Sequence, residues 1–238
     1  GRGHPDRTVG PVALIPCRPM SGIPGRSSHR TPSSWTSRSS ASPWLAPARA
    51  IRVNFLGELG WELHHPIEYQ LHIFDKLTAA GADLGLKPLG LRAMDSLRLE
   101  KSYRLPGREL SIEYAAFESG LQRFAHPNKG EFIGRDALVE WQQKGFDYAF
   151  TTLEVHDVTD ADALGSNPIY HQGEVVGRAT SGGYGFRIGK SLMLAMVKPD
   201  LSVPGTELET DILGTKHRCT VLEESPYDPN NERLRADG

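Results

Sequence analysis

The sequence has few cysteines, no long apolar run and no regular cluster of metal ligands. Among its 238 residues are two cysteines, Cys17 and Cys219, too few for a framework of disulfides. No stretch approaches the roughly 18 consecutive apolar residues of a membrane span, so we predict no membrane association. His64 and His65 are adjacent and would point to opposite faces of a strand, so we predict no metal site.

Nucleotide-binding and nucleophile motifs are missing as well. Gly189-Lys190-Ser191 is similar to the end of a phosphate loop, but Tyr184 occupies the position of the first required glycine. The glycines nearby also do not fit a dinucleotide-binding pattern, and we interpret Ser181 to Gly185 as a tight connection between strands. Because there is no Gly-x-Ser-x-Gly elbow or paired Cys/His nucleophile, the sequence identifies no catalytic residue.

The first fifty residues differ sharply from the rest. They carry seven arginines, no lysine and one acid, whereas the remaining 188 residues carry 20 basic and 28 acidic groups. Gly, Pro, Ser and Arg supply 29 of the fifty, so we predict that residues 1–50 are disordered or aberrant. A transit peptide is opposed by eight prolines, and a nucleic-acid-binding arm by the absence of interleaved aromatics. The composition favours a stretch read out of frame, and we predict no nucleic-acid partner.

Beyond Ala50 the pattern predicts helices and strands. Alternating residues and a glycine-containing turn predict a hairpin, with strands over 51–55 and 61–64. Three helices are predicted over 66–80, from Pro88 to before Gly107, and over 134–144. In the second helix, the predicted apolar side comprises Leu91, Met94, Leu97 and Tyr103, and the predicted polar side comprises Arg92, Asp95, Arg98 and Lys101.

The C-terminal part predicts an all-β unit. Short β-rich runs bounded by turn residues lie at 150–155, 174–179, 192–197, 207–213 and 217–222. Such spacing is typical of a small barrel or sandwich, and we expect a barrel. The predicted fold class is therefore α+β, with an α/β region over 51–145 followed by a C-terminal β-barrel over 146–238.

Glu62 is a candidate binding residue for which the sequence pattern allows two interpretations. It follows Trp61 in an otherwise apolar strand, so an inward-facing carboxylate would need a partner that donates hydrogen bonds. A pteridine presents a ring N–H and a 2-amino group side by side, and one carboxylate can accept both. From the pattern alone, a solvated Glu62, or one paired with an arginine of the second predicted helix, is the simpler interpretation.

Four motifs in order resemble the aminomethyltransferase family, which includes the glycine-cleavage T protein and the C-terminal half of dimethylglycine and sarcosine dehydrogenases. They are Gly57-Glu58-Leu59-Gly60-Trp61-Glu62, the stretch from Gly90 to Arg104, the run from Gly130 to Leu138, and Val176 to Gly185 followed by Gly189-Lys190-Ser191. The resemblance covers about residues 51–238. Trp61, the segment 101–104 and Gly183-Tyr184-Gly185 are more similar to the dehydrogenase branch.

The resemblance implies a folate site. The glutamate that matches Glu62 binds the pteridine, and the tyrosine that matches Tyr103 lines the site. Phe55 occupies a position where a tyrosine often contributes a hydroxyl, and Met94 one where the T protein typically has an arginine. We therefore expect Glu62, Tyr103, Phe55 and Met94 at the site. The catalytic aspartate of the family lies in an upstream portion with no counterpart in residues 1–50.

The implied function is a fragment of a folate-linked dimethylglycine or sarcosine-type dehydrogenase, which captures a one-carbon unit as 5,10-methylene-tetrahydrofolate. The expected cofactor is tetrahydrofolate, with FAD only in an upstream domain of the parent protein. Expected partners are folate, a small methylamine and that FAD-binding domain. The location would be the bacterial cytoplasm or the mitochondrial matrix. A fragment of a stand-alone T-type aminomethyltransferase, and a folate-family binding module without turnover, are the alternatives.

Overall fold

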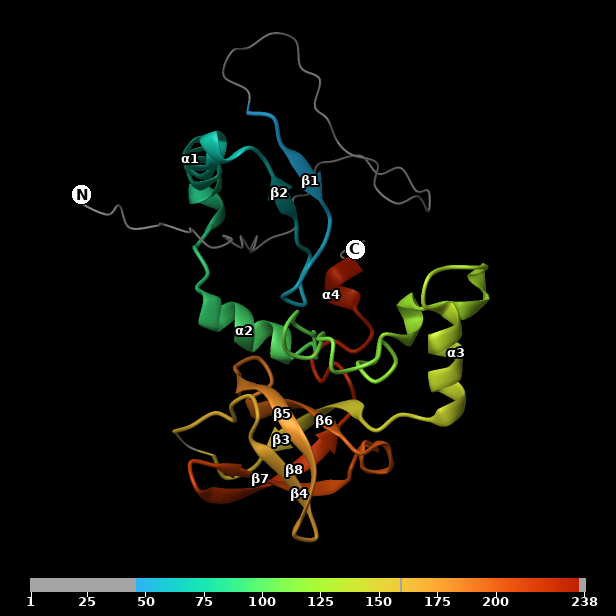
Figure 1. Cartoon of the computed structure of the whole chain (residues 1–238). Coiled ribbons are helices and arrows are strands. Elements are labelled where there is room, and N and C mark those ends of the chain that lie inside the picture. The colour runs from blue at the N-terminus through green and yellow to red at the C-terminus, as the bar shows by residue number, and fades with distance from the viewer. Residues whose placement is uncertain (1–45, 159, 236–238) are drawn as a thin grey trace, which may run out of the picture. The chain divides into compact units, whose positions relative to one another are not determined.

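A computed structural model describes residues 46–158 and 160–235 (Figure 1). The predicted disorder of residues 1–50 lies outside the described residues up to position 45, whereas Arg49 and Ala50 already belong to a strand. Internal contacts divide the described residues into two compact units, residues 46–94 with 231–235 and the described residues of 95–230. Within the two described ranges, every helix is too short or too polar to span a bilayer.

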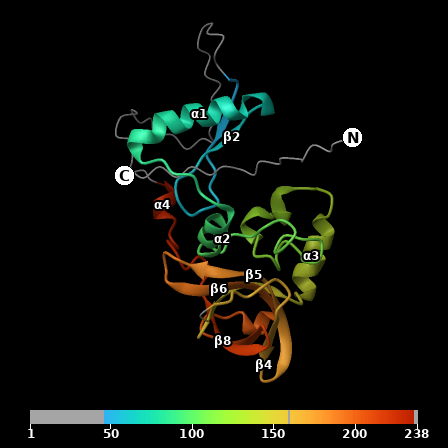
Figure 2. The same ribbon diagram turned by 90° about the vertical axis from the view of Figure 1, so that its left-hand side faces the viewer.

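The predicted hairpin is present in the first unit, but its strands are shorter than expected (Figure 2). Strand β1 (Arg49–Ile51) pairs antiparallel with β2 (Glu62–His64), with Ile51 opposite Glu62. The predicted first strand over 51–55 is wrong after Ile51. The N–H of Val53 donates to the carbonyl of Ile51 at 3.1 Å, which turns the chain before the ladder can continue.

The first predicted helix is confirmed as a composite. A 3₁₀ turn, η1 (Ile67–Tyr69), leads into α1 (Gln70–Gly81), and a second turn, η2 (Ala82–Leu84), follows. Gly81 is required because a Cβ there would lie 2.6 Å from the side chain of Leu86. Gly85 then ends the segment in the left-handed conformation, with φ at 74°.

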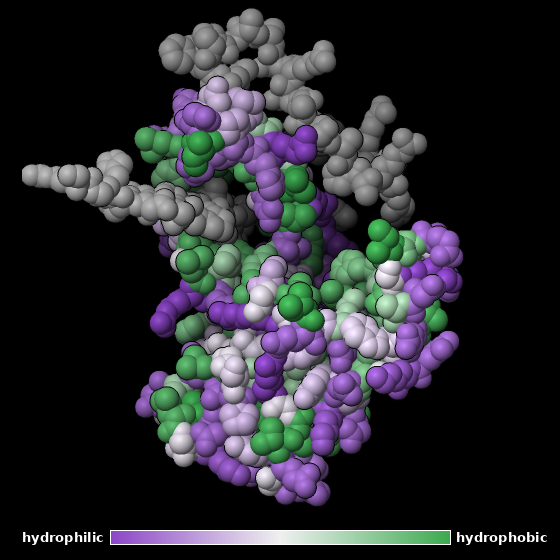
Figure 3. All heavy atoms as spheres, in the orientation of Figure 1, coloured by the Kyte–Doolittle hydropathy of each residue, from purple (hydrophilic) through white to green (hydrophobic). Residues whose placement is uncertain are grey.

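Much apolar surface of the first unit is exposed. Ile67 is 77% exposed, Leu71 is 70% exposed and Leu84 is 57% exposed. Figure 3 shows hydrophobic side chains at the surface around α1. The C-terminal helix α4 (Glu232–Arg235) also belongs to this unit, where the guanidinium of Arg52 donates to the carbonyls of Leu234 and Arg235 at 3.2 and 2.8 Å.

Helix α2 (Leu91–Leu99) is shorter than predicted, and the division between the units falls inside it. It ends because the N–H groups of Ser102 and Tyr103 turn back to the carbonyls of Leu99 and Arg98. The predicted assignment of its two sides is wrong, since Leu91 is 63% exposed whereas Arg98 and Lys101 are completely buried. Paired charges inside the second unit have overridden the hydrophobic pattern.

The connection to the barrel contains the third predicted helix. Two 3₁₀ turns, η3 (Gln122–Phe124) and η4 (Pro127–Lys129), precede α3 (Arg135–Lys144). Gly145 ends α3 as predicted, because its positive φ of 88° lets its N–H donate to the carbonyl of Trp141 at 3.1 Å.

The predicted C-terminal barrel is present and closed, with strand order β3-β6-β5-β4-β7-β8 (Figure 1). Its strands are β3 (Ala149–Val155), β4 (Pro168–His171), β5 (Glu174–Gly185), β6 (Lys190–Val197), β7 (Glu207–Ile212) and β8 (Thr215–Leu222), with the 3₁₀ turn η5 (Pro199–Leu201) after β6. All neighbouring strands are antiparallel, and pairing of β3 with β8 closes the cylinder. The core is apolar and includes Leu153, Ile169, Val176, Met193, Leu208, Ile212 and Val221. Closure leaves no long strand edge open in the barrel.

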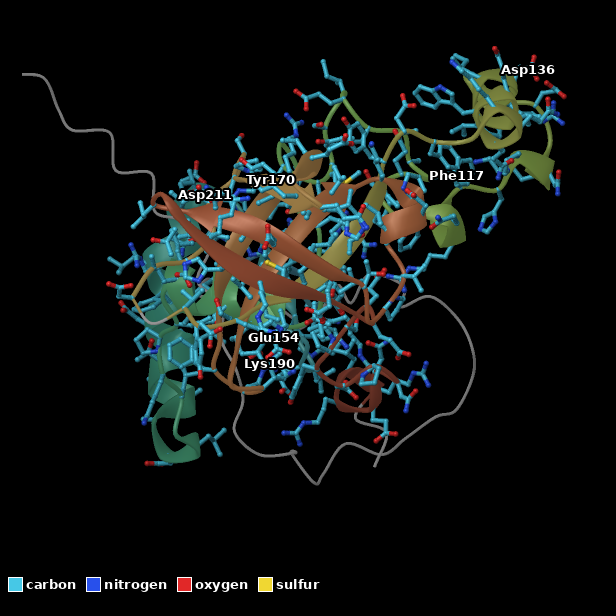
Figure 4. The ribbon with its side chains drawn as sticks, turned by 90° about the horizontal axis from the view of Figure 1, so that it is seen from below. Phe117, Asp136, Glu154, Tyr170, Lys190 and Asp211 are labelled. Atoms are coloured by element: carbon cyan, nitrogen blue, oxygen red, sulfur yellow. The ribbon has the colours of Figure 1, made fainter. Side chains whose placement is uncertain are left out.

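Two features of the barrel differ from the sequence prediction. The pattern missed β4, a four-residue strand that begins with Pro168. The interpretation of Ser181 to Gly185 as a connection is wrong, because these residues continue β5 in register with β6. Glu154 of β3 and Lys190 of β6 form an ion pair on this part of the barrel (Figure 4).

Candidate functional site

A cluster of buried charges surrounds the turn after α2, entirely within the second unit. Five polar or charged residues there have no exposed surface: Arg98, Glu100, Lys101, Ser102 and Glu109. Such residues are rarely buried unless each one is paired. Their partners therefore determine how the segment 98–109 is held.

Arg98 connects α2 to the turn. Its Nε donates to Oδ1 of Asp95, one helical turn earlier, at 2.6 Å. Its Nη1 donates to the carbonyl of Tyr103 at 3.0 Å and lies 3.8 Å from Oε2 of Glu109. Nη2 has no hydrogen-bond partner among the described residues.

Glu109 connects the same turn to the barrel. Its Oε1 accepts the hydroxyls of Thr180 and Ser181 in β5, at 2.5 and 2.7 Å, and its Oε2 accepts the N–H of Leu105 at 2.9 Å. Three donors and the nearby Arg98 guanidinium offset the desolvation of this carboxylate. The loop after Tyr103 is therefore fixed against β5.

Glu100 faces the β5–β6 hairpin. Arg187 donates its backbone N–H to Oε1 at 2.6 Å and its Nε to Oε2. Its Nη2 reaches the carbonyl of Leu97 at 3.1 Å, and its guanidinium lies 3.6 Å from the ring centre of Tyr227. Gly185 permits this approach, since a Cβ there would be 2.9 Å from Cγ of Glu100.

Lys101 holds the segment that follows the barrel. Its Nζ donates to the carbonyls of Tyr227 and Asp228 at 3.1 and 2.7 Å, and lies 4.0 Å from Oδ2 of Asp228. The N–H of Tyr227 donates in return to the carbonyl of Glu100 at 3.0 Å. The segment 224–228 and the turn after α2 are thus linked in both directions.

Tyr103, a site residue predicted from the sequence, emerges from this fixed turn partly buried. Burial raises the pKa of its phenol above the ordinary 10.0, the positive charge of Arg123 lowers it, and the carboxylate of Asp228 raises it. The net pKa is raised, so the phenol keeps its proton at neutral pH and can donate a hydrogen bond.

The other three predicted site residues lie in the first unit. Glu62 is solvated, as the simpler interpretation of the pattern has it, because all of β2 is exposed and the Glu62 side chain is 60% exposed. Its Oε2 lies 3.3 Å from Nε2 of His64, rather than against an arginine of α2. Phe55 and Met94 are partly buried.

The structure therefore collects Glu62, Phe55 and Met94 in one unit and Tyr103 in the other. Sequence reasoning missed the buried charges around Tyr103. A usable signal was present, since Arg98-Leu99-Glu100-Lys101-Ser102 places alternating charges where an ordinary helix would end. Among the described residues, no three His, Cys, Asp or Glu side chains are grouped so that they could hold a metal ion.

Two family models match the chain in succession. The GCVT N-terminal domain matches residues 34–129, and the glycine cleavage T-protein C-terminal barrel domain matches residues 149–228. A crystal structure of glycine cleavage system aminomethyltransferase T from Bartonella henselae superimposes with a TM-score of 0.69 and 25% identity, over 76% of this chain and 50% of that one.

Relatives of this chain include much longer enzymes. Mitochondrial dimethylglycine dehydrogenase of Mus musculus is 36% identical over 81% of this chain and 22% of that protein. The 4-methylaminobutanoate oxidase (formaldehyde-forming) of Paenarthrobacter nicotinovorans is 35% identical over 79% of this chain and 23% of that protein. The chain thus spans less than a quarter of these relatives. The N-terminal domain model and the barrel domain model match consecutive parts of this chain, and the relatives match about four fifths of it. The chain therefore belongs to the aminomethyltransferase (glycine-cleavage T-protein) family.

Proposed function

We propose that this chain is the folate-binding, aminomethyltransferase-type part of a dehydrogenase that acts on dimethylglycine, sarcosine or a related N-methylated amine. The observation that supports this proposal is the match of the two family models in succession, together with relatives named for N-methylated amino acids. Such an enzyme would work in the mitochondrial matrix or the bacterial cytoplasm.

The names of the relatives suggest the chemistry. One is called formaldehyde-forming, which gives the oxidation level of the carbon that leaves the amine. When bound, tetrahydrofolate supplies two amine nitrogens that take up such a carbon as 5,10-methylene-tetrahydrofolate, with loss of water. Because this capture is redox-neutral, oxidation of the amine needs a separate centre, and we propose an FAD-binding domain of the parent protein as that partner.

Glu62 and Tyr103 are the proposed polar contacts. The carboxylate of Glu62 can accept the ring N–H and the 2-amino group of a pteridine, and it is not committed to a buried network. The protonated phenol of Tyr103 can donate. Phe55 and Met94 would add apolar contact without a hydroxyl or a charge. These residues would hold the ligand, orient its amines and limit access of water to the reactive carbon.

A titration tests the proposal. The full chain is titrated with 5-formyl-tetrahydrofolate by calorimetry, beside Glu62→Ala and the matched control Glu68→Ala, another exposed glutamate of the first unit. Charge-assisted hydrogen bonds contribute about 1.5–3 kcal/mol, so Glu62→Ala should raise the Kd about 10- to 100-fold, with the control unchanged. No binding by the wild type, or equal affinities in all three, would reject the proposal.

The structural match favours one alternative, a T-type aminomethyltransferase that receives its one-carbon unit from a lipoyl carrier protein. The two functions differ in what adjoins this chain. An in-frame FAD-binding sequence upstream in the gene would favour the dehydrogenase, whereas the missing half of a T protein there would favour the transferase. A chain that binds folate but supports turnover in neither setting would be a binding module.

A further inference from the structure

Tyr103 follows a backbone turn whose conformation depends on contacts with surrounding residues. Ser102, immediately before it, adopts a positive φ of 56°, which L-residues with a side chain rarely adopt. Such a conformation persists when surrounding contacts fix it. The side chain of Ser102 is itself held, since its Oγ lies 2.8 Å from Oγ1 of Thr152 and accepts the N–H of Ser225 at 3.0 Å.

Arg98 and Tyr103 are joined by a reciprocal pair of hydrogen bonds. Nη1 of Arg98 donates to the carbonyl of Tyr103, and the N–H of Tyr103 donates to the carbonyl of Arg98, both at 3.0 Å. The guanidinium is in turn oriented by Asp95 at Nε and by Glu109 beside Nη1. Both backbone polar groups of Tyr103 are therefore fixed by one residue.

Stability alone is a poor explanation for Arg98. Its side chain is completely buried, yet Nη2 donates to no described residue, and a buried donor without an acceptor costs free energy. An apolar side chain of similar volume often fills such a position at no loss of stability. An apolar residue could not, however, donate a hydrogen bond to the Tyr103 carbonyl, as Nη1 of Arg98 does.

We propose that Arg98 is a positioning residue that sets the backbone of Tyr103, and with it the direction of the Tyr103 phenol, for the folate ligand. The inference rests on the proposed function for its ligand, but not for its geometry. Arg98 is assigned no contact with folate. Its effect on binding is transmitted through Tyr103.

The first experiment needs no ligand. The full chain is labelled with ¹³C-tyrosine, the Tyr103 signal is assigned by its loss in Tyr103→Phe, and its ionisation is followed by NMR. Arg98→Lys keeps the positive charge but loses the planar guanidinium that donates to both Asp95 and the Tyr103 carbonyl. In this variant we expect the pKa of the Tyr103 phenol to move from its raised value toward 10. The Tyr103 amide should also exchange at least tenfold faster. An unchanged Tyr103 signal and exchange rate in Arg98→Lys would overturn the proposal.

Two further variants separate positioning from general damage. Arg187→Lys disturbs the same turn through Glu100 but does not change the side chain that donates to the Tyr103 carbonyl. It should therefore leave the Tyr103 signal unchanged. If Arg98→Lys does not fold, Asp95→Asn loosens the guanidinium from a partly exposed position and should shift Tyr103 in the same direction by a smaller amount. No shift in Asp95→Asn, or an equal shift in Arg187→Lys, would contradict the role assigned to Arg98.

The second experiment uses 5-formyl-tetrahydrofolate in a double-mutant cycle of Arg98→Lys and Tyr103→Phe. We expect Arg98→Lys to weaken binding about tenfold in the wild type but less than twofold when Tyr103 is already Phe. Equal weakening in both backgrounds would mean that Arg98 acts by another route. If the wild type binds no folate, the proposed function fails, and the tyrosine titration still supports or overturns the placement of Tyr103 by Arg98.

Discussion

Gly182 offers a sharp test of the way β5 is packed. The pattern around it predicted a tight connection between strands, but the structure places Gly182 inside β5 against the segment that contains Ala163. A Cβ on Gly182 would lie 2.8 Å from the carbonyl carbon of Ala163 and 2.9 Å from its Cβ, and closer still to its carbonyl oxygen. Because two of these atoms are backbone, rotation of a side chain cannot relieve the contact.

The expected cost follows from overpacking. Ala163 is buried, so the backbone must shift by several tenths of an ångström to admit the methyl group, and such changes cost about 1–3 kcal/mol. For a unit of this size, about 3–5 °C of melting temperature is lost per kcal/mol. Gly182→Ala should therefore lower the Tm of the barrel transition by about 3–15 °C.

Thermal unfolding followed by circular dichroism measures this loss. The matched control is Gly90→Ala, since nothing lies within 4 Å of a Cβ there and its φ is ordinary. It should change the Tm by no more than about 2 °C, because a glycine-to-alanine change without strain is neutral or mildly stabilising. A Gly182→Ala chain that melts within 1 °C of the wild type would refute the packing of β5 described above.

Three other predictions concern single side chains of the second unit. Leu153→Ala removes a fully buried side chain from the barrel core and should lower the free energy of unfolding by about 2–5 kcal/mol in urea titrations. Glu224→Gln weakens the fork that Arg104 makes at 2.5 and 3.0 Å, but Glu224 is 54% exposed, so the same titration should show a loss of no more than about 1 kcal/mol. Burial raises the pKa of the Cys219 thiol to about 12, so the folded state favours the neutral thiol and its contribution is complete below pH 9. As the pH rises from 9 to 12, the wild type should lose stability relative to Cys219→Ala by up to about 1.4 kcal/mol per pH unit, and parallel pH profiles would contradict this.

Local pattern was sufficient for the barrel and for the helices with clear ends. The strands around Leu153 and Leu194 alternate or run apolar between turn residues, and Gly145 marks the end of α3, so short-range rules apply. The strand β4 was missed because four residues beginning with proline carry almost no periodic signal. Its position depends on pairing with β5 and β7, which are far away in the sequence.

The candidate site could be predicted only in part. Tyr103 and Glu62 were named through resemblance, whereas the burial of Arg98 and Lys101 could not be read from α2 itself. Their partners are Glu109 and the carbonyls of Tyr227 and Asp228, and the last two lie more than a hundred residues away. A helical pattern ranks such residues as polar because it contains no information about distant acceptors. The exposure of Glu62 agrees with the simpler interpretation of the pattern, in which this carboxylate is solvated.

The first unit is assembled from two separate stretches of chain, because residues 231–235 return to it after the last strand of the barrel. Arg52 donates to the last carbonyls of α4, and Arg233 lies 3.6 Å from Glu58 in the loop that joins the two short strands. Removing residues 231–235, or fusing a bulky tag directly after Asn230, would therefore alter the hairpin that Arg52 and Glu58 adjoin and leave the barrel intact.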